Sequence, residues 1–383
     1  MKITYFTNEF PAVHKVYAEN EIHWLQNFGH HIELVAVWGG KKEWADEINF
    51  PIIYLERDTT HWKEFFKEIF RHLFKAAAHL FLLFKFLGFK ESIKYFSQYH
   101  MMNLENTDHI HAHFASNAAL RGLLASKYYQ IPFTCTGHGT ELLLKKAPYL
   151  KYLIKQSHQF VTISHYNKEK LISTYKIPEE RIHVKYCGVD TEYFKNNDFS
   201  RNELPIKLIS VTALRKVKGV EYLVQACNLL KFNNIDFQCK IIGTGELKLD
   251  IAAQIQKYRL ENDIKLMGAL TSEEIRDELS KSAVFILPSI SEGLPIAVME
   301  AMSMQLAVIA SNITGLPELI DNGVDGFLVD PMKPKFIAQK IIDLIHDPME
   351  LKNIQIAARR KIQKKFNLKD RVADMEKLFT HAH

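Results

Sequence analysis

The feature that most constrains the fold of this chain is a short, wholly apolar run that is followed at once by a turn and a helix. The run is Val284 to Leu287, and Pro288 with a serine-rich turn ends it. An uninterrupted apolar run of this length is typical of a strand buried on both faces of a parallel sheet. Pro295 suits the first helical position, because its fixed φ and missing N–H cost nothing there. We therefore predict a buried parallel strand, a loop and a helix that starts at Pro295.

The same loop predicts an anion site. Gly293 and Leu294 stand where a helix presents unpaired backbone N–H groups, and an anion such as a diphosphate can bind there. Glu292 precedes the helix and Glu300 follows eight residues later, a separation of up to about 12 Å along a helix. That span suits two hydroxyl-rich groups on either side of a diphosphate. The alternative is an ordinary helix with one acid that favours the helix dipole and a second that is merely solvated.

Length and composition limit the class of protein. A chain of 383 residues exceeds what one core usually supports, so we expect two domains. Four cysteines are too few for a disulfide framework or a zinc ribbon, which favours the reducing cytoplasm. The N-terminus has no signal-peptide pattern, and the most apolar segment, 76–87, is too short to span a bilayer. A net charge of +5 is mild, and we expect no nucleic-acid partner.

Strand and helix patterns alternate through both halves of the chain. The first half opens with a strand at 3–7, a helix at about 17–28 and a strand at 31–37. Its first turn has no Gly-x-Gly-x-x-Gly, so we expect no dinucleotide site there. Residues 195–205, rich in Asn and charge, predict a linker, after which strand–helix units begin again. The fold class is therefore α/β.

Residues 61–99 are helical in pattern and unusual in composition. Nine phenylalanines are interleaved there with seven Lys or Arg and three Glu, a local balance of +4. A basic, aromatic, amphipathic helix can lie on an anionic membrane surface. Two helices packed over a sheet with charged outer faces would give the same pattern. The localisation that we expect is cytoplasmic, with peripheral attachment to the inner face of the plasma membrane under the first alternative.

Histidines mark two places in the first half. His109, His111 and His113 alternate along a predicted strand and face one side of it. Three such histidines could bind a metal, or they could be buried and hydrogen-bonded. His138 lies between two glycines after the next strand, where open α/β sheets bind ligands, and Glu141 ends the same turn.

Motifs over most of the chain resemble the retaining nucleotide-sugar glycosyltransferases of family 4. The most specific is Glu292-Gly-Leu-Pro-Ile-Ala-Val-Met-Glu300, which matches the family's Glu-x7-Glu signature. The others are Ile110-His-Ala-His-Phe-Ala, Ile131-Pro-Phe-Thr-Cys-Thr-Gly-His-Gly, Cys187-Gly-Val-Asp, Lys218-Gly and Gly243-Thr-Gly-Glu. The chain looks most like the branch that builds bacterial exopolysaccharide, capsule or lipopolysaccharide.

The resemblance implies a GT-B fold, with two Rossmann-like, doubly wound domains that face each other across a cleft. The acceptor-side domain would span 1–195 and the nucleotide-sugar-binding domain 205–365, with a helix at 366–383 packing back on the first. The implied reaction moves a sugar, with retention, from a nucleotide diphosphate sugar to a glycan or lipid-linked glycan acceptor. It would need neither a metal ion nor a cofactor.

Carried over position by position, the resemblance also implies roles for single residues. Glu300 would bind the ribose hydroxyls, and Glu292 would bind the donor sugar and the diphosphate. Lys218 would neutralise the leaving diphosphate, since a cation stabilises it most in the transition state. The implied donor-binding set is Arg215, Lys218, Gly243, Glu292, Gly293, Leu294, Pro295 and Glu300. The implied catalytic residues are His138, Glu292 and Lys218, with His113 and Glu141 on the acceptor side.

The sequence departs from the family at three places. Thr212 and Ala213 replace a Gly-Arg pair before the lysine, which leaves Arg215 as the nearby arginine. Residues 305–307 replace a Gly-x-Pro, and 14–17 replace a Ser-Glu-Thr-Phe-like stretch. The missing arginine keeps open a non-catalytic GT-B pseudoenzyme or glycan-binding subunit. Two further alternatives are a metallohydrolase using the four histidines and a nucleotide-sugar epimerase.

Overall fold

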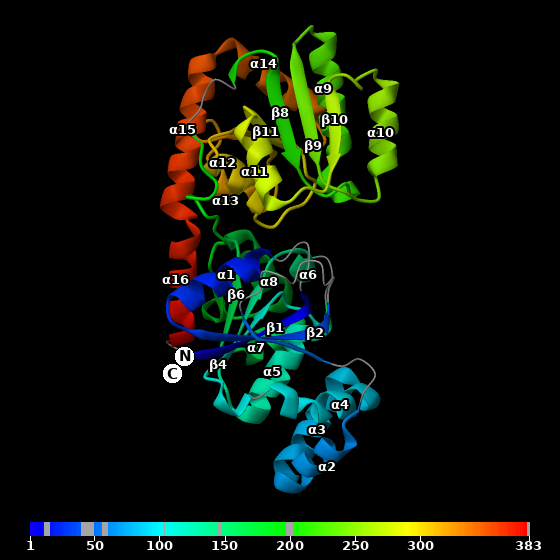
Figure 1. The fold of residues 1–383 in the computed structure, drawn as a ribbon, viewed down its shortest axis with the longest axis vertical. Helices are drawn as coiled ribbons and strands as arrows, with labels where there is room; N and C mark the ends of the chain where they lie inside the picture. The colour runs from blue at the N-terminus through cyan, green and yellow to red at the C-terminus, as the bar shows by residue number, and fades with distance from the viewer. Residues whose placement is uncertain are drawn as a thin grey trace. The chain divides into compact units, whose positions relative to one another are not determined.

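The structure is a computed structural model that describes residues 1–10, 16–39, 50–55, 60–102, 104–143, 147–196 and 202–380. The side chains of the first-loop stretch 14–17 therefore lie outside what it describes. The chain divides into two compact units (Figure 1). The first, the N-unit, is Met1–Lys185 with Val372–His383, and the second, the C-unit, is Tyr186–Arg371. These divisions fall before the boundary expected at 195 and after the one expected at 366.

The N-unit is built on a seven-stranded sheet in the order β3-β2-β1-β4-β5-β6-β7. Every pair of neighbouring strands in it is parallel. The strands are β1 (Lys2–Phe10), β2 (His31–Gly39), β3 (Ile52–Tyr54), β4 (His109–His113), β5 (Phe133–Gly137), β6 (Gln159–Thr162) and β7 (Ile182–Val184). All five residues of β4 and of β5 are buried, as expected for central strands covered on both faces.

The N-unit also contains helices. They are α1 (Val16–Asn27), α2 (Trp62–Arg71), α3 (Leu73–Leu87), α4 (Phe89–Ser97), α5 (Asn117–Tyr129), α6 (Thr140–Leu143), α7 (Leu150–Gln156) and α8 (His165–Tyr175). The segment predicted to be helical at 61–99 forms α2, α3 and α4, which pack on one another and, through α3, on α5 rather than on the sheet (Figure 1). The last helix, α16 (Leu368–Thr380), belongs to the N-unit from Val372 onward. The ring of its Phe379 contacts the rings of His109 and His111 of β4, at 4.8 and 5.1 Å between ring centroids and in tilted arrangements.

The C-unit has a six-stranded parallel sheet in the order β10-β9-β8-β11-β12-β13. Its strands are β8 (Ile206–Val211), β9 (Phe237–Ile242), β10 (Ile264–Gly268), β11 (Val284–Leu287), β12 (Ala307–Ser311) and β13 (Phe327–Val329). Its helices are α9 (Val220–Phe232), α10 (Lys248–Lys257), α11 (Ser272–Ser280), α12 (Ile296–Ser303), α13 (Leu316–Leu319), α14 (Pro334–His346) and α15 (Pro348–Lys365). The strand predicted at Val284 to Leu287 is confirmed with the same bounds and is wholly buried.

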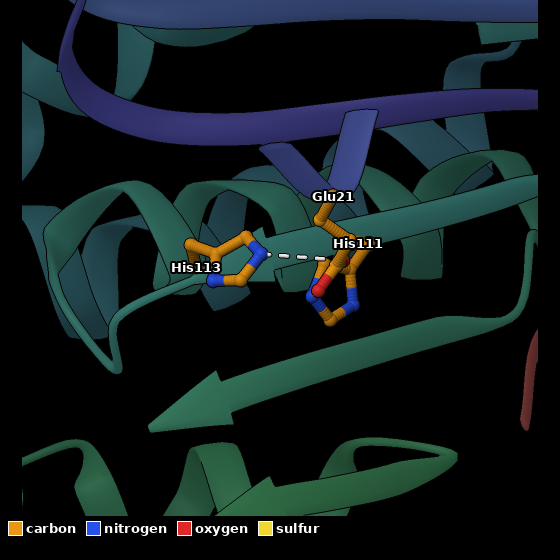
Figure 2. A group of neighbouring side chains, drawn as sticks. All are labelled: Glu21, His111 and His113. Carbon is orange, nitrogen blue, oxygen red and sulfur yellow. Dashed lines mark ion pairs between the residues drawn. The ribbon is translucent and has the colours of Figure 1, made fainter. Parts of the chain in front are cut away.

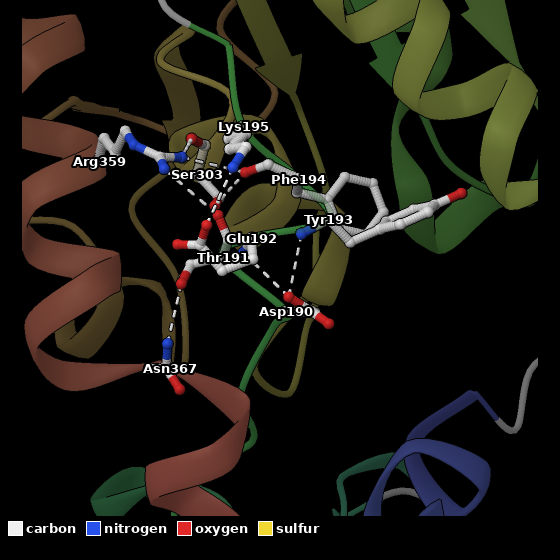
Figure 3. A network of polar contacts seen from close by, with 9 residues as sticks. All are labelled: Asp190, Thr191, Glu192, Tyr193, Phe194, Lys195, Ser303, Arg359 and Asn367. Carbon is white, nitrogen blue, oxygen red and sulfur yellow. Dashed lines mark hydrogen bonds and ion pairs between the residues drawn. The ribbon is translucent and has the colours of Figure 1, made fainter.

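The chain that enters the C-unit is tied to α12 and α15 before the expected linker begins. Arg359 donates hydrogen bonds to the carbonyl oxygens of Thr191 and Phe194, at 3.3 and 3.1 Å, and of Ser303 at 2.5 Å (Figure 3). Asn367 Nδ2 donates to Thr191 Oγ1 at 2.8 Å. These contacts satisfy carbonyl groups of an irregular segment, and they explain why residues 186–196 belong to the C-unit.

Both sheets reverse their strand order at one point. In the N-unit the chain builds outward from β1 to β3 and then returns to place β4 on the other side of β1. In the C-unit it builds from β8 to β10 and returns to place β11 beside β8. Open α/β sheets bind ligands at such switch points, outside the carboxyl ends of the strands. The loop after β4 in the N-unit and the loops after β8 and β11 in the C-unit therefore lie at switch points, and the loop after β5 follows the strand next to β4.

Candidate functional site

Two loops of the C-unit meet at the end of β11. The basic turn that follows β8 forms a short 3₁₀ helix at Lys216–Lys218 and ends at Gly219, whose φ is +61°. A Cβ on Gly219 would lie 2.3 Å from the carbonyl oxygen of Pro288, so only glycine allows this approach. Ile290 N–H donates to the carbonyl of Val217 at 2.8 Å. The basic turn is thus fixed against the loop that carries Glu292.

This packing joins Lys218 to Glu292. The ammonium of Lys218 lies 2.7 and 2.8 Å from the two carboxylate oxygens of Glu292. Ser289 Oγ donates to the same carboxylate at 2.6 Å, and Thr314 Oγ1 accepts from the Glu292 N–H at 3.3 Å. The side chain of Lys218 is 26% exposed, whereas that of Glu292 is 7% exposed. A partly accessible cation is therefore held in place by a nearly buried acid.

The start of α12 differs by one residue from the prediction. Pro295 is the residue before the helix, because its ψ of 119° is extended, and the helix begins at Ile296. Gly293 and Leu294 lie before the helix, as predicted, but Pro295 now separates them from its first residue. Within the described part of the chain, their N–H groups have no hydrogen-bond partner. Two unpaired backbone N–H donors therefore follow Glu292 directly in the sequence, although they do not belong to the helix α12.

The glycine turn after β9 is locked to the loop after β8. Gly243 has a φ of +137°, and a Cβ there would lie 2.0 Å from the carbonyl oxygen of Thr212. Leu214 N–H donates to the carbonyl of Thr244, and Leu247 N–H donates to that of Leu214. These contacts place the two loops side by side at the C-terminal edge of the sheet.

The sequence also assigns Glu300 and Arg215 to donor binding. Glu300 stands on α12 and is partly exposed. Burial of its carboxyl group raises its pKa to about 7. Arg215 is exposed at the start of the basic turn and takes no part in the Lys218–Glu292 pair. Its backbone carbonyl accepts the N–H of Lys218 at 2.8 Å, so it helps to form the turn.

In the N-unit, the strand histidines are buried and hydrogen-bonded. His109 Nε2 and His111 Nδ1 lie 2.9 and 2.7 Å from Thr134 Oγ1 on β5. His111 Nε2 lies 3.3 Å from Thr136 Oγ1. Burial, followed by the charge of His113, holds the pKa of His111 well below its ordinary value. His111 is therefore a neutral core residue that links two strands.

His113 instead connects His138 to a carboxylate that the sequence did not single out. His113 Nδ1 lies 3.0 Å from His138 Nε2. On its other side, His113 Nε2 lies 3.2 Å from Oε1 of Glu21, which reaches down from α1 (Figure 2). Tyr5 on β1 donates a hydrogen bond of 2.6 Å to the same oxygen. All four side chains are nearly or fully buried.

The charges of this cluster are set by their neighbours. Burial alone would raise the pKa of Glu21, but His113, through its hydrogen bond and through its charge whenever its ring is protonated, lowers that pKa to about 2, with smaller contributions from His111 and Tyr5. Burial, together with the charge that His113 carries when it is protonated, lowers the pKa of His138 to about 3. The cluster therefore holds an ionised carboxylate at one end and a neutral imidazole, His138, at the other.

Glu141 has a local role in the same loop. Its two carboxylate oxygens accept the N–H groups of His138 and Gly139, at 2.6 and 3.1 Å. Asn167 Nδ2 donates to the carbonyl of His138 at 2.9 Å. The backbone around His138 is thus held on both sides. The acceptor-side role expected for Glu141 stays a prediction.

Among the described residues, the one group with ligand-like spacing is Glu21, His111 and His113, whose ligand atoms lie within 4.8 Å of one another. It shares only two members with the four histidines named from the sequence. The hydrogen bonds to Thr134, Thr136 and Tyr5 and the Glu21–His113 ion pair account for the same arrangement without an ion.

Comparison with known protein families matches both halves of the chain. Residues 15–193 match the family described as Glycosyltransferase Family 4. Residues 192–361 match the family described as Glycosyl transferases group 1. The two matches meet near the division between the units, so each unit corresponds to one family domain. They favour a transferase over a metallohydrolase.

Similar proteins carry related names. The chain is 27% identical to the amylovoran biosynthesis glycosyltransferase AmsK of Erwinia amylovora, over 96% of each chain. It is 30% identical to the putative colanic acid biosynthesis glycosyltransferase WcaL of Salmonella typhimurium, over 65% of this chain and 62% of that one. It is 28% identical to an Escherichia coli UDP-Gal:alpha-D-GlcNAc-diphosphoundecaprenol alpha-1,3-galactosyltransferase, over 74% and 78%.

Solved structures agree on the fold. A glycosyltransferase from Rickettsia africae aligns with a TM-score of 0.74 and 22% identity, over 100% of this chain and 98% of that one. Anabaena Alr3699/HepE in complex with UDP-glucose aligns with a TM-score of 0.78 and 16% identity, over all of both chains. With two doubly wound parallel-sheet domains and both family matches, this chain is a glycosyltransferase of the GT-B fold, with a family 4 domain followed by a group 1 domain.

Proposed function

We propose that this protein moves a sugar from a nucleoside diphosphate sugar to a glycan or lipid-linked glycan acceptor during cell-surface polysaccharide synthesis, with retention at the anomeric carbon. The observation that carries the proposal is the Lys218–Glu292 pair at the switch point of the C-unit sheet. The names of the relatives support polysaccharide synthesis and a lipid-linked acceptor. UDP sugars are the first donors to test, because UDP-glucose and UDP-Gal occur in the titles of similar proteins.

The chemistry that we propose for the donor side uses groups already in place. As the bond between the anomeric carbon and the diphosphate breaks, negative charge grows on the leaving oxygen. Lys218 and the free N–H groups of Gly293 and Leu294 would stabilise that charge more in the transition state than in the ground state. Glu292 would hold Lys218 in place and accept hydrogen bonds from the sugar.

We propose that the acceptor attacks from the face that the diphosphate leaves. The new bond joins the acceptor oxygen to the anomeric carbon, the old bond to the diphosphate breaks, and a phosphate oxygen takes the acceptor's proton. The product keeps the configuration of the donor. His138 would hold a hydroxyl of the reacting sugar through its neutral imidazole.

The first test uses the pKa of Glu300. We expect a UDP sugar to raise the melting temperature of the protein, since a ligand of the native state stabilises it. A carboxylate accepts the ribose hydroxyls best when ionised, so binding should favour loss of the Glu300 proton and strengthen as the pH rises. Between pH 8 and pH 6, a group with a pKa of about 7 falls from about nine-tenths to about one-tenth ionised. We therefore expect affinity for the donor to drop about tenfold over this range.

Glu300→Gln is the matched control for that test. Glutamine has nearly the same shape but no charge to lose, so its weaker affinity should not depend on pH in this range. A UDP sugar suits the experiment because its diphosphate, esterified at both ends, gains no proton between pH 6 and pH 8. Equal pH dependence in both proteins would remove Glu300 from the ribose site. No shift with UDP, GDP or ADP sugars in the native protein would favour the pseudoenzyme.

We further propose that α2, α3 and α4 attach the protein to an anionic membrane surface. The phenylalanines of this segment differ in exposure, and Phe84 and Phe86 are partly buried. Phe65 and Phe96 are buried against the N-unit core, whereas Phe70, Phe74 and Phe81 are 81, 88 and 76% exposed. We use the name aromatic surface for the exposed large apolar residues of this segment, most of which are aromatic. They are Trp62, Phe66, Phe70, Leu73, Phe74, Phe81 and Phe89.

Spacing and charge support this proposal. Trp62, Phe66 and Phe70 are four residues apart on α2, and Phe74 and Phe81 are seven apart on α3, so each set follows one face of its helix. Exposed basic side chains accompany them, namely Lys63, Lys67, Arg71, Lys75, Lys85 and Lys90. Large exposed aromatics beside lysines suit the boundary between lipid headgroups and acyl chains. In the part of the chain that the structure describes, no helix combines the length and apolarity needed to cross a bilayer.

A triple substitution tests the membrane proposal. We expect Phe70→Ser, Phe74→Ser and Phe81→Ser together to weaken binding to phosphatidylglycerol vesicles by at least about tenfold, since each loses a large apolar side chain. Binding of the native protein should also weaken with salt. Phe232→Ser is the matched control, because Phe232 is 84% exposed on α9 of the C-unit. Absence of vesicle binding at every salt concentration would leave α2 to α4 as ordinary packing.

A further inference from the structure

A chain of four buried side chains ends at His138. Tyr5 OH donates to Glu21 Oε1 at 2.6 Å, Glu21 Oε1 lies 3.2 Å from His113 Nε2, and His113 Nδ1 lies 3.0 Å from His138 Nε2. The four come from β1, α1, the end of β4 and the loop after β5. Neither the family matches nor the names of similar proteins assign Glu21 a role.

The hydrogen-bonding chemistry of each group predicts which ring nitrogens of His113 and His138 carry a proton. An ionised carboxylate accepts hydrogen bonds and donates none, so Glu21 favours a proton on the Nε2 that faces it. When Nε2 carries the single proton of the His113 ring, Nδ1 is an acceptor. His138 must then turn an N–H toward it and keep its own proton on Nε2. The carboxylate thus selects the tautomer of a ring that it does not touch.

Among the described residues, His113 is the one imidazole within hydrogen-bond distance of Glu21. His111 Nε2 is 3.9 Å from Glu21 Oε1, beyond hydrogen-bond distance, and both of its ring nitrogens already face threonine hydroxyls on β5. Tyr5 donates its proton to Glu21 and orients the carboxylate. His113 is therefore the route by which Glu21 acts.

We propose that Glu21 is a positioning residue that acts through His113 to hold His138 with its proton on Nε2 and its lone pair on Nδ1. A lone pair at Nδ1 is the acceptor that a hydrogen bond from a sugar hydroxyl requires, and this atom is buried in the structure. The arrangement has the logic of a carboxylate that orients a histidine in a hydrolase triad, where loss of the charge gives the wrong tautomer. Its effect on turnover rests on the proposed function of sugar transfer, while its effect on His138 does not.

The test replaces Glu21 by glutamine. The side-chain amide can donate to His113 Nε2, which reverses the preferred proton position along the chain. In ¹⁵N spectra of histidine-labelled protein we expect His138 to be the Nε2–H tautomer in the native protein and a mixture, or the opposite tautomer, in Glu21→Gln. We expect kcat to fall about ten- to a hundredfold, less than for loss of a general acid or base itself, with KM for the donor nearly unchanged.

Two controls separate positioning from a structural role. Glu19→Gln lies two residues earlier on α1, about 200° around the helix, and should change neither the spectrum of His138 nor kcat. In a His138→Ala background, Glu21→Gln should cost no further turnover, because its only route of action is gone. Equal losses in both backgrounds, or an unchanged His138 spectrum in Glu21→Gln, would overturn the proposal. If the native protein transfers no sugar, the proposed function fails and the spectrum alone decides the role of Glu21.

Discussion

Replacing Lys218 by alanine is expected to reduce kcat about 100- to 1,000-fold, the size of effect seen when one group that stabilises a developing negative charge is removed. The physical reason is the position of its ammonium, 2.7 and 2.8 Å from the oxygens of Glu292 at the switch point of the sheet. A departing diphosphate would gain charge next to this cation. Donor affinity should fall as well, because the ground-state diphosphate is already anionic. Product formation from a UDP sugar and a lipid-linked acceptor is the measurement.

The basic turn offers its own control. Lys216 lies two residues earlier, is exposed and belongs to the same 3₁₀ helix, so Lys216→Ala should change kcat less than about twofold. We expect the native protein to keep its activity in excess chelator, since we propose that Lys218 does the work of a metal ion. Added Mg²⁺ should not restore Lys218→Ala. Near-native turnover in Lys218→Ala, or activity abolished by chelator and restored by a divalent ion, would refute this assignment.

The largest loss of stability is expected from Gly243→Ala. A Cβ at this position would lie 2.0 Å from the carbonyl oxygen of Thr212, and φ is +137°. The strained backbone and the forced shift of a backbone carbonyl together should lower the free energy of unfolding of the C-unit by about 3 to 5 kcal/mol. The relevant transition is the one that a UDP sugar shifts, because a chain of two domains need not unfold in one step.

Gly323→Ala isolates the backbone part of that cost. Gly323 has a φ of +77°, and no heavy atom lies within 4 Å of the place that a Cβ would take. We expect a loss of about 1 to 2 kcal/mol, the cost of a left-handed conformation alone. The difference between the two variants measures how tightly the loops after β8 and β9 are packed. Equal losses would mean that the Thr212 carbonyl moves aside without cost.

Local patterns in the sequence were enough to identify the elements of the C-unit. The strand at Val284–Leu287 has the predicted bounds because a proline and a turn end an apolar run that is buried on both faces. The start of α12 was wrong by one residue, since ψ at Pro295, which the sequence does not fix, is extended. Lys218 and Glu292 were named separately through the family resemblance, but their spacing in the sequence did not predict that they form an ion pair.

Local sequence patterns likewise could not predict which phenylalanines of α2, α3 and α4 are buried. The sequence left a membrane face and ordinary packing open, because α3 is apolar around most of its circumference. Only the packed structure shows that Phe65 and Phe96 are buried while Phe74 is 88% exposed. Amphipathic periodicity reports which side chains share a face, and the neighbouring elements decide which face is covered.

Glu21 illustrates the difference between what local sequence patterns predict and what tertiary packing decides. The sequence placed His109, His111 and His113 on one face of a strand, because alternation along a strand is a local property. It gave no reason to choose Glu21, which is one of 44 acidic residues and lies 92 positions before His113. The parallel sheet sets β4 beside β1, and the intervening chain places α1 so that its carboxylate meets the end of β4. Periodicity and glycine turns therefore determined the two α/β domains, whereas the pairing of charges across distant segments was decided by tertiary packing.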